Sequence, residues 1–317
     1  MSEKSKIYKP KPVSGFPEWL PEYRAVELAW MDKIRKVFES YGFCSIETPS
    51  VEEIDVLLAK GGDTEKEIYT LHRLQAEEGE DADARLALHF DLTVPMARYV
   101  AQHFGGLVFP FKRYQMQRVW RGERPQKGRY REFYQCDIDV INIDTLPLHF
   151  DAELPAVMFE AYQALDIPPV ELRLSNRKII WGFLQGLGIN DIAAVTRILD
   201  KRDKIGAEGV EKMLGGMGVS KDTAQKILAP LMIRTSDAGA LETHFGNVKN
   251  NMLQEGVNEL KFVMQNLAHL KSDAVIDLGI IRGLDYYTGT ILEAYFKDID
   301  YGAVGSGGRY DDLAGSF

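Results

Sequence analysis

Two neighbouring segments, 112–121 and 130–142, alternate between polar and apolar residues with the two-residue period of β-strands. Gly122 to Gly128 separate them, so they predict a strand–loop–strand hairpin. One face of the second segment would carry Tyr134, Cys136, Ile138 and Val140. Its other face would carry Phe133, Gln135, Asp137 and Asp139. On the first segment the matching polar face holds Gln115, Gln117 and Arg121. Because the opposite face of the two strands is apolar, we predict that the polar face is the floor of a binding site.

The loop of this hairpin is basic in a chain that is acidic elsewhere. The chain has 38 Lys and Arg against 47 Asp and Glu, a formal net charge of −9. Around the loop stand Arg121, Arg124, Lys127, Arg129 and Arg131. Arginine suits a phosphate or a carboxylate because it offers two parallel hydrogen bonds and keeps its charge. The loop could therefore cover a polyphosphate. The alternative is a solvated hairpin tip whose cations pair with Glu123 and Glu132.

Two further segments combine glycines with recognition groups. RGLDYYTG at 282–289 offers a cation, a carboxylate and two phenols, although a hairpin turn with its tyrosines on the core would read the same. VGSGGRYDD at 304–312 lacks both the GxGxxG spacing and the GK[ST] of nucleotide-binding loops. Its glycines are equally consistent with a turn that needs positive φ or close backbone approach.

Other chemistries have little support in the sequence. The six histidines show no paired ligand spacing, so no metal site is expected, and no GxSxG motif indicates a serine hydrolase. Cys44 and Cys136 are expected to be reduced, buried thiols. No apolar run approaches a membrane span, and the N-terminus has no signal core, so we expect a cytoplasmic protein without membrane contact.

The order of the remaining signals predicts an α+β fold, a mostly antiparallel sheet flanked by helices. A helix is expected over 22–41, and a second begins near Asp91, with Asp91 or Thr93 as its cap and Pro95 in its first turn. Helices follow at 151–165 and after the strand near 170. Residues 188–271 predict a helical insertion without strands, between core parts 1–187 and 272–317. Strands are expected again within 274–281, 290–296 and the glycine-rich segment 302–313.

At this point the motifs resemble those of a known family. The segment 111–142 resembles motif 2 of class II aminoacyl-tRNA synthetases, in the form found in histidyl-tRNA synthetases. RGLDYYTGTILEAY and GSGGRYDDL resemble the two histidine-specific segments of that family, and HFDLTVPMARYVAQH its strand–helix step at the amino-acid pocket. The helix at 22–41 with ETPSVE resembles the dimer-forming motif 1 region. The similarity runs from about residue 6 to the end.

The resemblance implies roles for individual residues. Arg121 and Arg282 would be catalytic, flanking the α-phosphate of ATP. ATP would be bound by Arg121, Glu123, Arg129 and Phe133. L-Histidine would be bound by Asp91, Thr93, Gln135, Asp139, Arg282, Tyr286, Tyr287 and Tyr310. The tRNA acceptor end would meet Arg124, Gln126 and Lys127.

The implied reaction is ATP-dependent formation of histidyl-adenylate, followed by transfer of the histidyl group to the 3′ end of tRNA(His). Mg²⁺ would accompany ATP, and the protein would be a homodimer through the motif 1 region. Two positions depart from the pattern: His89 stands where many relatives have arginine, and Ser306 replaces a glycine.

The resemblance also leads us to expect a catalytic-domain fragment, since the sequence stops before a motif 3 segment and an anticodon-binding domain. An alternative is the regulatory subunit of ATP phosphoribosyltransferase, which resembles such a core but is not catalytic. A tRNA-binding pseudo-enzyme is a second alternative.

Overall fold

The computed structural model describes residues 9–59, 66–74, 85–126, 128–239, 241–281, 287–311, 313, 315 and 317. The chain divides into two compact units. The first unit holds the described residues within Met1–Val108, Lys112–Asp139 and Ala314–Phe317. The second holds Phe109–Phe111 and those within Val140–Leu313. Together they confirm the α+β class. The predicted division at 187/188 and 271/272 stays a prediction.

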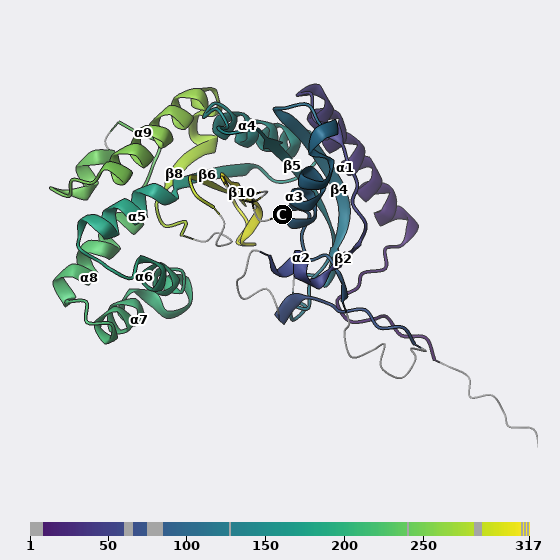
Figure 1. Ribbon diagram of the computed structural model, residues 1–317, viewed down its shortest axis with the longest axis horizontal. Helices are drawn as coiled ribbons and strands as arrows, with labels where there is room; N and C mark the ends of the chain where they lie inside the picture. Colours follow the sequence, from purple (N-terminus) through teal and green to yellow (C-terminus); the bar gives the residue numbers. More distant parts are fainter. Residues whose placement is uncertain are drawn as a thin grey trace, which may run out of the picture. The chain divides into compact units, whose positions relative to one another are not determined.

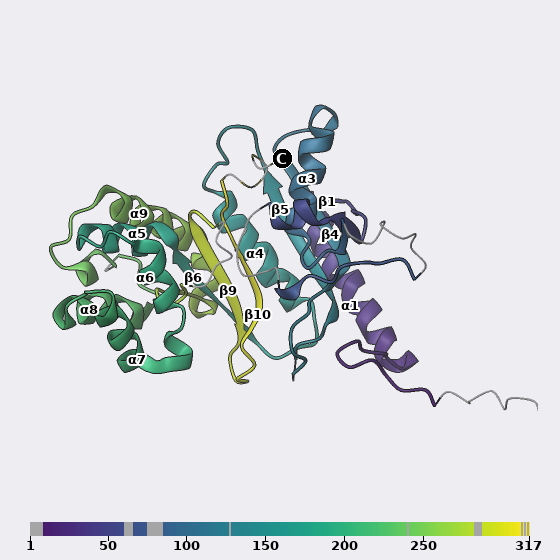
Figure 2. The same cartoon turned by 60° about the horizontal axis from the view of Figure 1, so that its bottom comes forward.

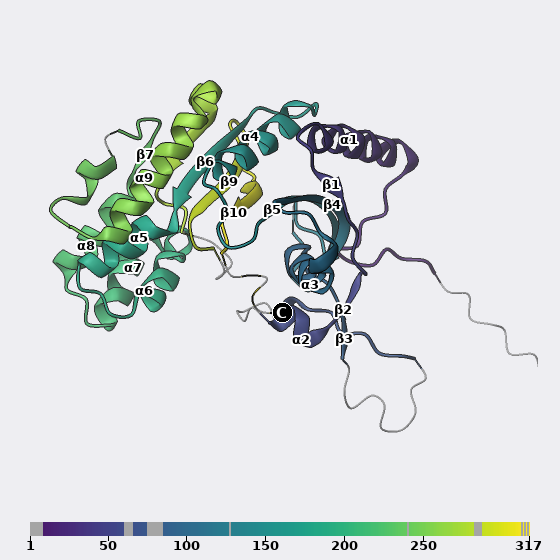
Figure 3. The ribbon, with the colours of Figure 1, turned by 45° about the horizontal axis from the view of Figure 1, so that its top comes forward.

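The first unit is built on the predicted hairpin. Strands β4 (Phe111–Trp120) and β5 (Glu132–Ile141) lie side by side, and the short β1 (Cys44–Ser45) pairs in parallel with β4. Figure 3 shows α1 (Pro21–Ser40) on one side of these strands and α3 (Thr93–His103) on the other. Alternation explains this placement: Tyr114 packs against Phe38 of α1, while its neighbour Arg113 turns toward the start of α3. A smaller pair, β2 (Val51–Glu53) with β3 (Leu86–Leu88), borders α2 (Ile54–Leu58).

The second unit contains a mixed sheet in the order β10-β9-β6-β8-β7 among the described strands. β9 (Thr290–Phe296) pairs antiparallel with both β10 (Ala303–Gly308) and β6 (Val170–Asn176), whereas β6 and β8 (Ala274–Asp277) are parallel. In Figure 1, α4 (Phe150–Gln163) and α9 (Asn251–Asn266) lie along this sheet. Leu172 and Leu174 of β6 are fully buried in the core formed with these helices. Burial of such aliphatic side chains is the main stabilising contribution here.

A helical group follows β6 along the chain. It comprises α5 (Arg177–Gly186), α6 (Ile192–Leu199), α7 (Arg202–Gly216) and α8 (Lys221–Leu228), which gather together in Figure 2. They share a second apolar core that includes Leu184, Val210 and Ile227. Side chains cap several of these helices; Asp191 accepts the N–H of Ala194 at 2.9 Å.

Two expectations about local structure are wrong. The segment 188–271 is not free of strands, because Arg234–Thr235 forms β7 and pairs antiparallel with β8. A two-residue strand is too short to produce an alternating pattern.

Cys44 is exposed rather than buried, since β1 lies at a sheet edge, and its thiol donates to the carbonyl of Lys112 at 3.1 Å. Cys136 is half-buried, and burial raises its thiol pKa to about 12.

None of the described helices is both long and apolar enough to cross a bilayer.

Candidate active site

The polar face of the β4–β5 pair carries a chain of hydrogen bonds that starts at Arg121, directly after β4. Its Nε–H donates to the carbonyl of Phe90 (3.0 Å), and Nη2–H donates to Oε1 of Gln135 (3.2 Å). The amide nitrogen of Gln135 donates in turn to both carboxylate oxygens of Asp137 (3.3 Å each). The ring of Phe133 lies 5.2 Å from the Arg121 guanidinium. The predicted side chains on one strand face therefore do meet Arg121.

Arg121 makes these contacts only with neutral oxygens. Within the described residues, no carboxylate comes within ion-pair distance of its guanidinium. Neutral acceptors orient an arginine without neutralising it, so the half-buried cation keeps its attraction for an anion. This suits a phosphate or a substrate carboxylate.

A second arginine, Arg113, was not singled out by the sequence analysis. Its side chain is fully buried and pairs with Asp139. Its Nη1–H donates to Gln115 (3.3 Å), and Nη2–H donates to the carbonyl of Leu92 just before α3 (3.5 Å). Gln115 also donates to Gln117 at 2.7 Å. The signal was present in the spacing, because Arg113 is two residues before Gln115 and therefore shares its face.

Asp91, just before α3, is a buried acidic residue, only 3% exposed. One oxygen caps α3 by accepting the N–H of Val94 at 3.2 Å, as the sequence predicted, while Oδ2 has no partner among the described residues. Burial raises the carboxyl pKa of Asp91 to about 6, helped by the charge of Asp137. Burial likewise raises the pKa of Asp137 to about 6, although Arg113 opposes the shift. A cationic or N–H donor ligand would lower both pKa values again. Thr93 is the first residue of α3, half-buried beside them.

The hairpin loop turns tightly at Gly128, where φ is +76°. Gln126 and Arg129 exchange main-chain hydrogen bonds across it (3.2 and 2.9 Å). Arg129 lies 3.5 Å from Glu123, so part of the predicted pairing at the loop tip exists. Both Arg129 and the neighbouring Arg124 are exposed, which leaves them available to a large polyanion. Lys127 lies outside the described residues.

The segment before α1, at Ser14 and Gly15, forms hydrogen bonds with this loop. Gly15 accepts the main-chain N–H of Arg131 at 2.7 Å, and a side chain at Gly15 would collide with Pro125 and Arg131 at 2.8 and 2.9 Å. Arg131 also donates to the carbonyls of Glu123 (3.0 Å) and Ser14 (3.4 Å). The basic loop is thus anchored by the segment before α1.

His89 occupies a wholly buried position. Its Nε2 is 2.7 Å from the carbonyl of Arg118, and its ring lies 5.5 Å from that of Trp120. Burial lowers the imidazole pKa, which favours a neutral ring. The histidine therefore fills this place as a packed, uncharged side chain, unlike the arginine that the resemblance implies there.

The remaining predicted residues belong to the second unit. Tyr287 and Tyr310 are both half-buried and flank a short junction between the segments 287–290 and 308–311. Arg282 and Tyr286 lie outside the described residues. The second unit therefore brings two of its predicted tyrosines together on adjoining segments.

The first unit thus brings the cation of Arg121, at the polar face of β4 and β5, near the carboxyl groups of Asp137 on β5 and of buried Asp91 before α3. A cation beside carboxylates is the complement of an amino-acid zwitterion. Residues 15–317 match the family described as histidyl-tRNA synthetase. The chain belongs to the histidyl-tRNA synthetase family.

Several relatives carry the same name. A protein of Thermobifida fusca named histidine–tRNA ligase is 57% identical, over 100% of this chain and 73% of its own length. One of Bifidobacterium longum is 46% identical, over 95% and 69%. The crystal structure of histidyl-tRNA synthetase from Nostoc sp. PCC 7120 matches with a TM-score of 0.84 and 39% identity, over 98% of this chain and 70% of that one.

The fold alone is shared with a more distant structure. A protein of Bacillus halodurans C described as an ATP phosphoribosyltransferase regulatory subunit/histidyl-tRNA synthetase matches with a TM-score of 0.83 at 21% identity.

Proposed function

We propose that this chain activates L-histidine with ATP and transfers the histidyl group to the 3′ end of tRNA(His). The observation that carries the proposal is Arg121, a half-buried cation that donates hydrogen bonds only to neutral acceptors and lies near the buried carboxyl group of Asp91. The names of the relatives over the whole chain support the same function.

In the proposed complex the histidine carboxylate and the α-phosphate meet at Arg121, and Arg282 is assigned to the opposite side. The ammonium group of histidine donates to the partnerless Oδ2 of Asp91. Gln135 and Asp139 complete the polar wall, with Thr93 at the start of α3. Tyr286, Tyr287 and Tyr310 are assigned to the imidazole.

The proposed first step joins a histidine carboxylate oxygen to the α-phosphorus of ATP and releases pyrophosphate. In the second step a ribose hydroxyl of the tRNA takes the acyl group, and AMP leaves. No covalent bond to the protein forms. The residues of the chain act by positioning the reactants and stabilising the negative charge that grows on the phosphorus oxygens.

ATP is assigned to the loop, with Glu123 and Arg129 at its two ends and the Phe133 ring beneath the adenine. Mg²⁺ accompanying ATP would neutralise phosphate charge. Arg124, Gln126 and Lys127 are assigned to the tRNA acceptor end.

The proposal includes a cytoplasmic homodimer formed through α1 and the segment after it. Large apolar side chains of α1 are exposed, among them Tyr23 at 61%, Val26 at 49% and Leu28 at 48%. Such a row of exposed apolar groups fits a protein interface.

The test is histidine-dependent exchange between pyrophosphate and ATP, measured on the 317-residue chain and on the full reading frame that encodes it. We expect exchange with histidine in the full product and none with other amino acids. Exchange in neither, with histidine still bound, would contradict the proposal and favour the regulatory alternative. Exchange with a different amino acid would contradict the assigned substrate.

A further inference from the structure

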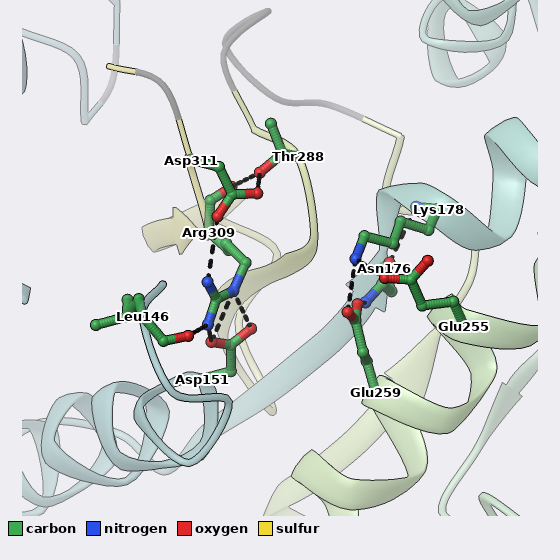
Figure 4. A network of polar contacts seen from close by, with 9 residues as sticks. All are labelled: Leu146, Asp151, Asn176, Lys178, Glu255, Glu259, Thr288, Arg309 and Asp311. Carbon is green, nitrogen blue, oxygen red and sulfur yellow. Dashed lines mark hydrogen bonds and ion pairs between the residues drawn. The ribbon is translucent and has the colours of Figure 1, made fainter. Parts of the chain in front are cut away.

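Arg309, in the second unit, is an arginine that the proposed reaction does not use. It follows β10 and extends toward the loop that precedes α4 (Figure 4). Its Nε–H donates to Asp151 (3.1 Å), and its Nη2–H donates both to Asp151 (2.8 Å) and to the carbonyl of Leu146 (2.9 Å). Nη1–H donates to Asp311 at 3.2 Å. The side chains of Arg309 and Asp151 are only 9% and 4% exposed. Hydrogen bonds to two carboxylates and a carbonyl hold this guanidinium in one orientation.

The main chain of Arg309 joins two segments that are distant in the sequence. Its N–H donates to the carbonyl of Thr290, and its carbonyl accepts the N–H of Thr288, both at 2.8 Å. The hydroxyl of Thr288 donates to Asp311, as Figure 4 shows. The segment 288–290 is therefore fastened to 309–311 at both the main-chain and the side-chain level.

Two glycines, Gly289 and Gly308, allow close packing between these segments and the side chains of Arg309 and Tyr287. A Cβ at Gly289 would lie 2.9 Å from Cδ of Arg309, so the stem of the arginine packs directly on that glycine. A Cβ at Gly308 would lie 2.8 Å from Cδ1 of Tyr287, so the Tyr287 ring packs on the end of β10. Tyr310 is the next residue after Arg309. Movement of the arginine would consequently displace both aromatic side chains.

We propose that the Arg309–Asp151 ion pair is a positioning element that fixes Tyr287 and Tyr310 for the imidazole side chain of the substrate. The proposal rests on the proposed function, and it assigns to Arg309 and Asp151 a role in selecting the amino acid rather than in the chemistry. An ion pair that is buried and anchored at the start of a helix gives the pocket wall a rigid support, which an isolated hairpin would lack.

The competing explanation is that the ion pair only stabilises the second unit. A structural role would lower the melting temperature and the fraction of active protein but would leave both KM values unchanged. A positioning role would raise the KM for histidine selectively, because misplacement of a contact group by about 1 Å can cost about a hundredfold.

The variants are Arg309→Lys, which keeps the charge but loses the planar fork, Asp151→Asn and the milder Thr288→Val. The matched control is Lys178→Met, from the other network of Figure 4. There Lys178 lies 2.6 Å from both Glu255 and Glu259, linking α5 to α9 without contacting Arg309.

Two measurements, on the protein expressed from the full reading frame, decide between the positioning role and the purely stabilising role. Hydrogen exchange of the peptides covering 287–290 and 308–311 should quicken in the three variants and not in Lys178→Met. In ATP–pyrophosphate exchange, the histidine KM should rise about tenfold or more in Arg309→Lys and Asp151→Asn, while the ATP KM stays within about twofold.

Unchanged histidine KM in Arg309→Lys, Asp151→Asn and Thr288→Val would overturn the inference, as would an equal rise in the Lys178→Met control. Loss of kcat alone would also overturn it. The unsubstituted protein separates this failure from failure of the proposed function. If it shows no histidine-dependent ATP–pyrophosphate exchange, the proposed function is wrong. The hydrogen-exchange comparison still reports whether Arg309 orders the tyrosine segments.

Discussion

Arg121 and Arg309 are both arginines at the ends of β-strands, yet their surroundings are opposite. Arg121 donates to a carbonyl and an amide oxygen and has no carboxylate within ion-pair distance among the described residues. Arg309 donates to two carboxylates and a carbonyl. The first arginine has carboxyl groups nearby but no ion pair with any of them, and the second is held in an ion pair by the protein itself.

The comparison suggests a rule for reading such sites. An arginine kept for a ligand is oriented by neutral acceptors, because a carboxylate partner would compete with the incoming anion. An arginine that supports a pocket wall is paired with carboxylates, because a buried cation without them would be costly. Arg113, buried with Asp139, belongs to the second kind.

The largest expected effect is on stability at Arg309. Arg309→Met should lower the free energy of unfolding by about 3–5 kcal/mol, since it leaves Asp151 buried without its partner. Urea denaturation would measure the change. The double variant Arg309→Met/Asp151→Leu should regain most of the loss because no charge is left stranded. A loss below about 1 kcal/mol in the single variant would break the contrast between the two arginines.

Arg121→Met should show the reverse pattern. Exchange of pyrophosphate should fall by about 10²- to 10³-fold, as for removal of other groups that stabilise transition-state charge. The free energy of unfolding should fall by only about 1 kcal/mol, because a carbonyl and an amide oxygen lose a donor but no carboxylate loses an ion pair. Normal exchange in this variant would remove Arg121 from the proposed chemistry.

Asp91→Asn tests the carboxylate that we assign to the ammonium group of histidine. The amide oxygen can still cap α3 through Val94, but the charge that would meet the histidine ammonium is gone. We expect the histidine KM to rise about ten- to a hundredfold, the scale of one hydrogen bond to a charged group, with little change in the ATP KM. Steady-state exchange at varied histidine gives both constants, and equal changes in the two would contradict the assignment.

The smallest effect concerns Asp137. Its carboxyl pKa is raised to about 6, so the folded state binds the proton more tightly than the unfolded state. Its contribution to stability is therefore lost as pH rises from about 4 to about 6. Asp137→Asn should raise the free energy of unfolding by about 1–2 kcal/mol at pH 7.5 and by almost nothing below pH 4. Asp139→Asn is the control with the opposite sign, since it leaves Arg113 buried without its counter-ion.

The sequence predicted the parts of the site that depend on local periodicity. Alternation along 130–142 placed Gln135 and Asp137 on one face, and in the structure Gln135 donates hydrogen bonds to Asp137. Asp91 or Thr93 was predicted to cap the helix from their place before a helical pattern, and the Asp91 carboxylate accepts the N–H of Val94. Such features depend on neighbours a few residues apart, which a single sequence displays.

The contacts that define the two kinds of arginine were not predictable in the same way. Asp151 and Arg309 are 158 positions apart, so nothing in the local pattern marks them as partners. The polar face suggested an anion site at Arg121, but only the structure shows that no carboxylate of the described residues forms an ion pair with it. The exposure of Cys44 was also missed, because the edge position of β1 depends on strand order rather than on composition.

The anchoring of the basic loop by the chain before α1 also has a consequence during synthesis. Ser14 and Arg131 are 117 positions apart, so the first partner leaves the ribosome long before the second is made. Contacts of such sequence separation form late because the intervening chain must first be ordered. The loop should therefore be among the last parts of the first unit to acquire its native shape on a translating ribosome, and an N-terminal fusion partner that draws Ser14 away would delay it further.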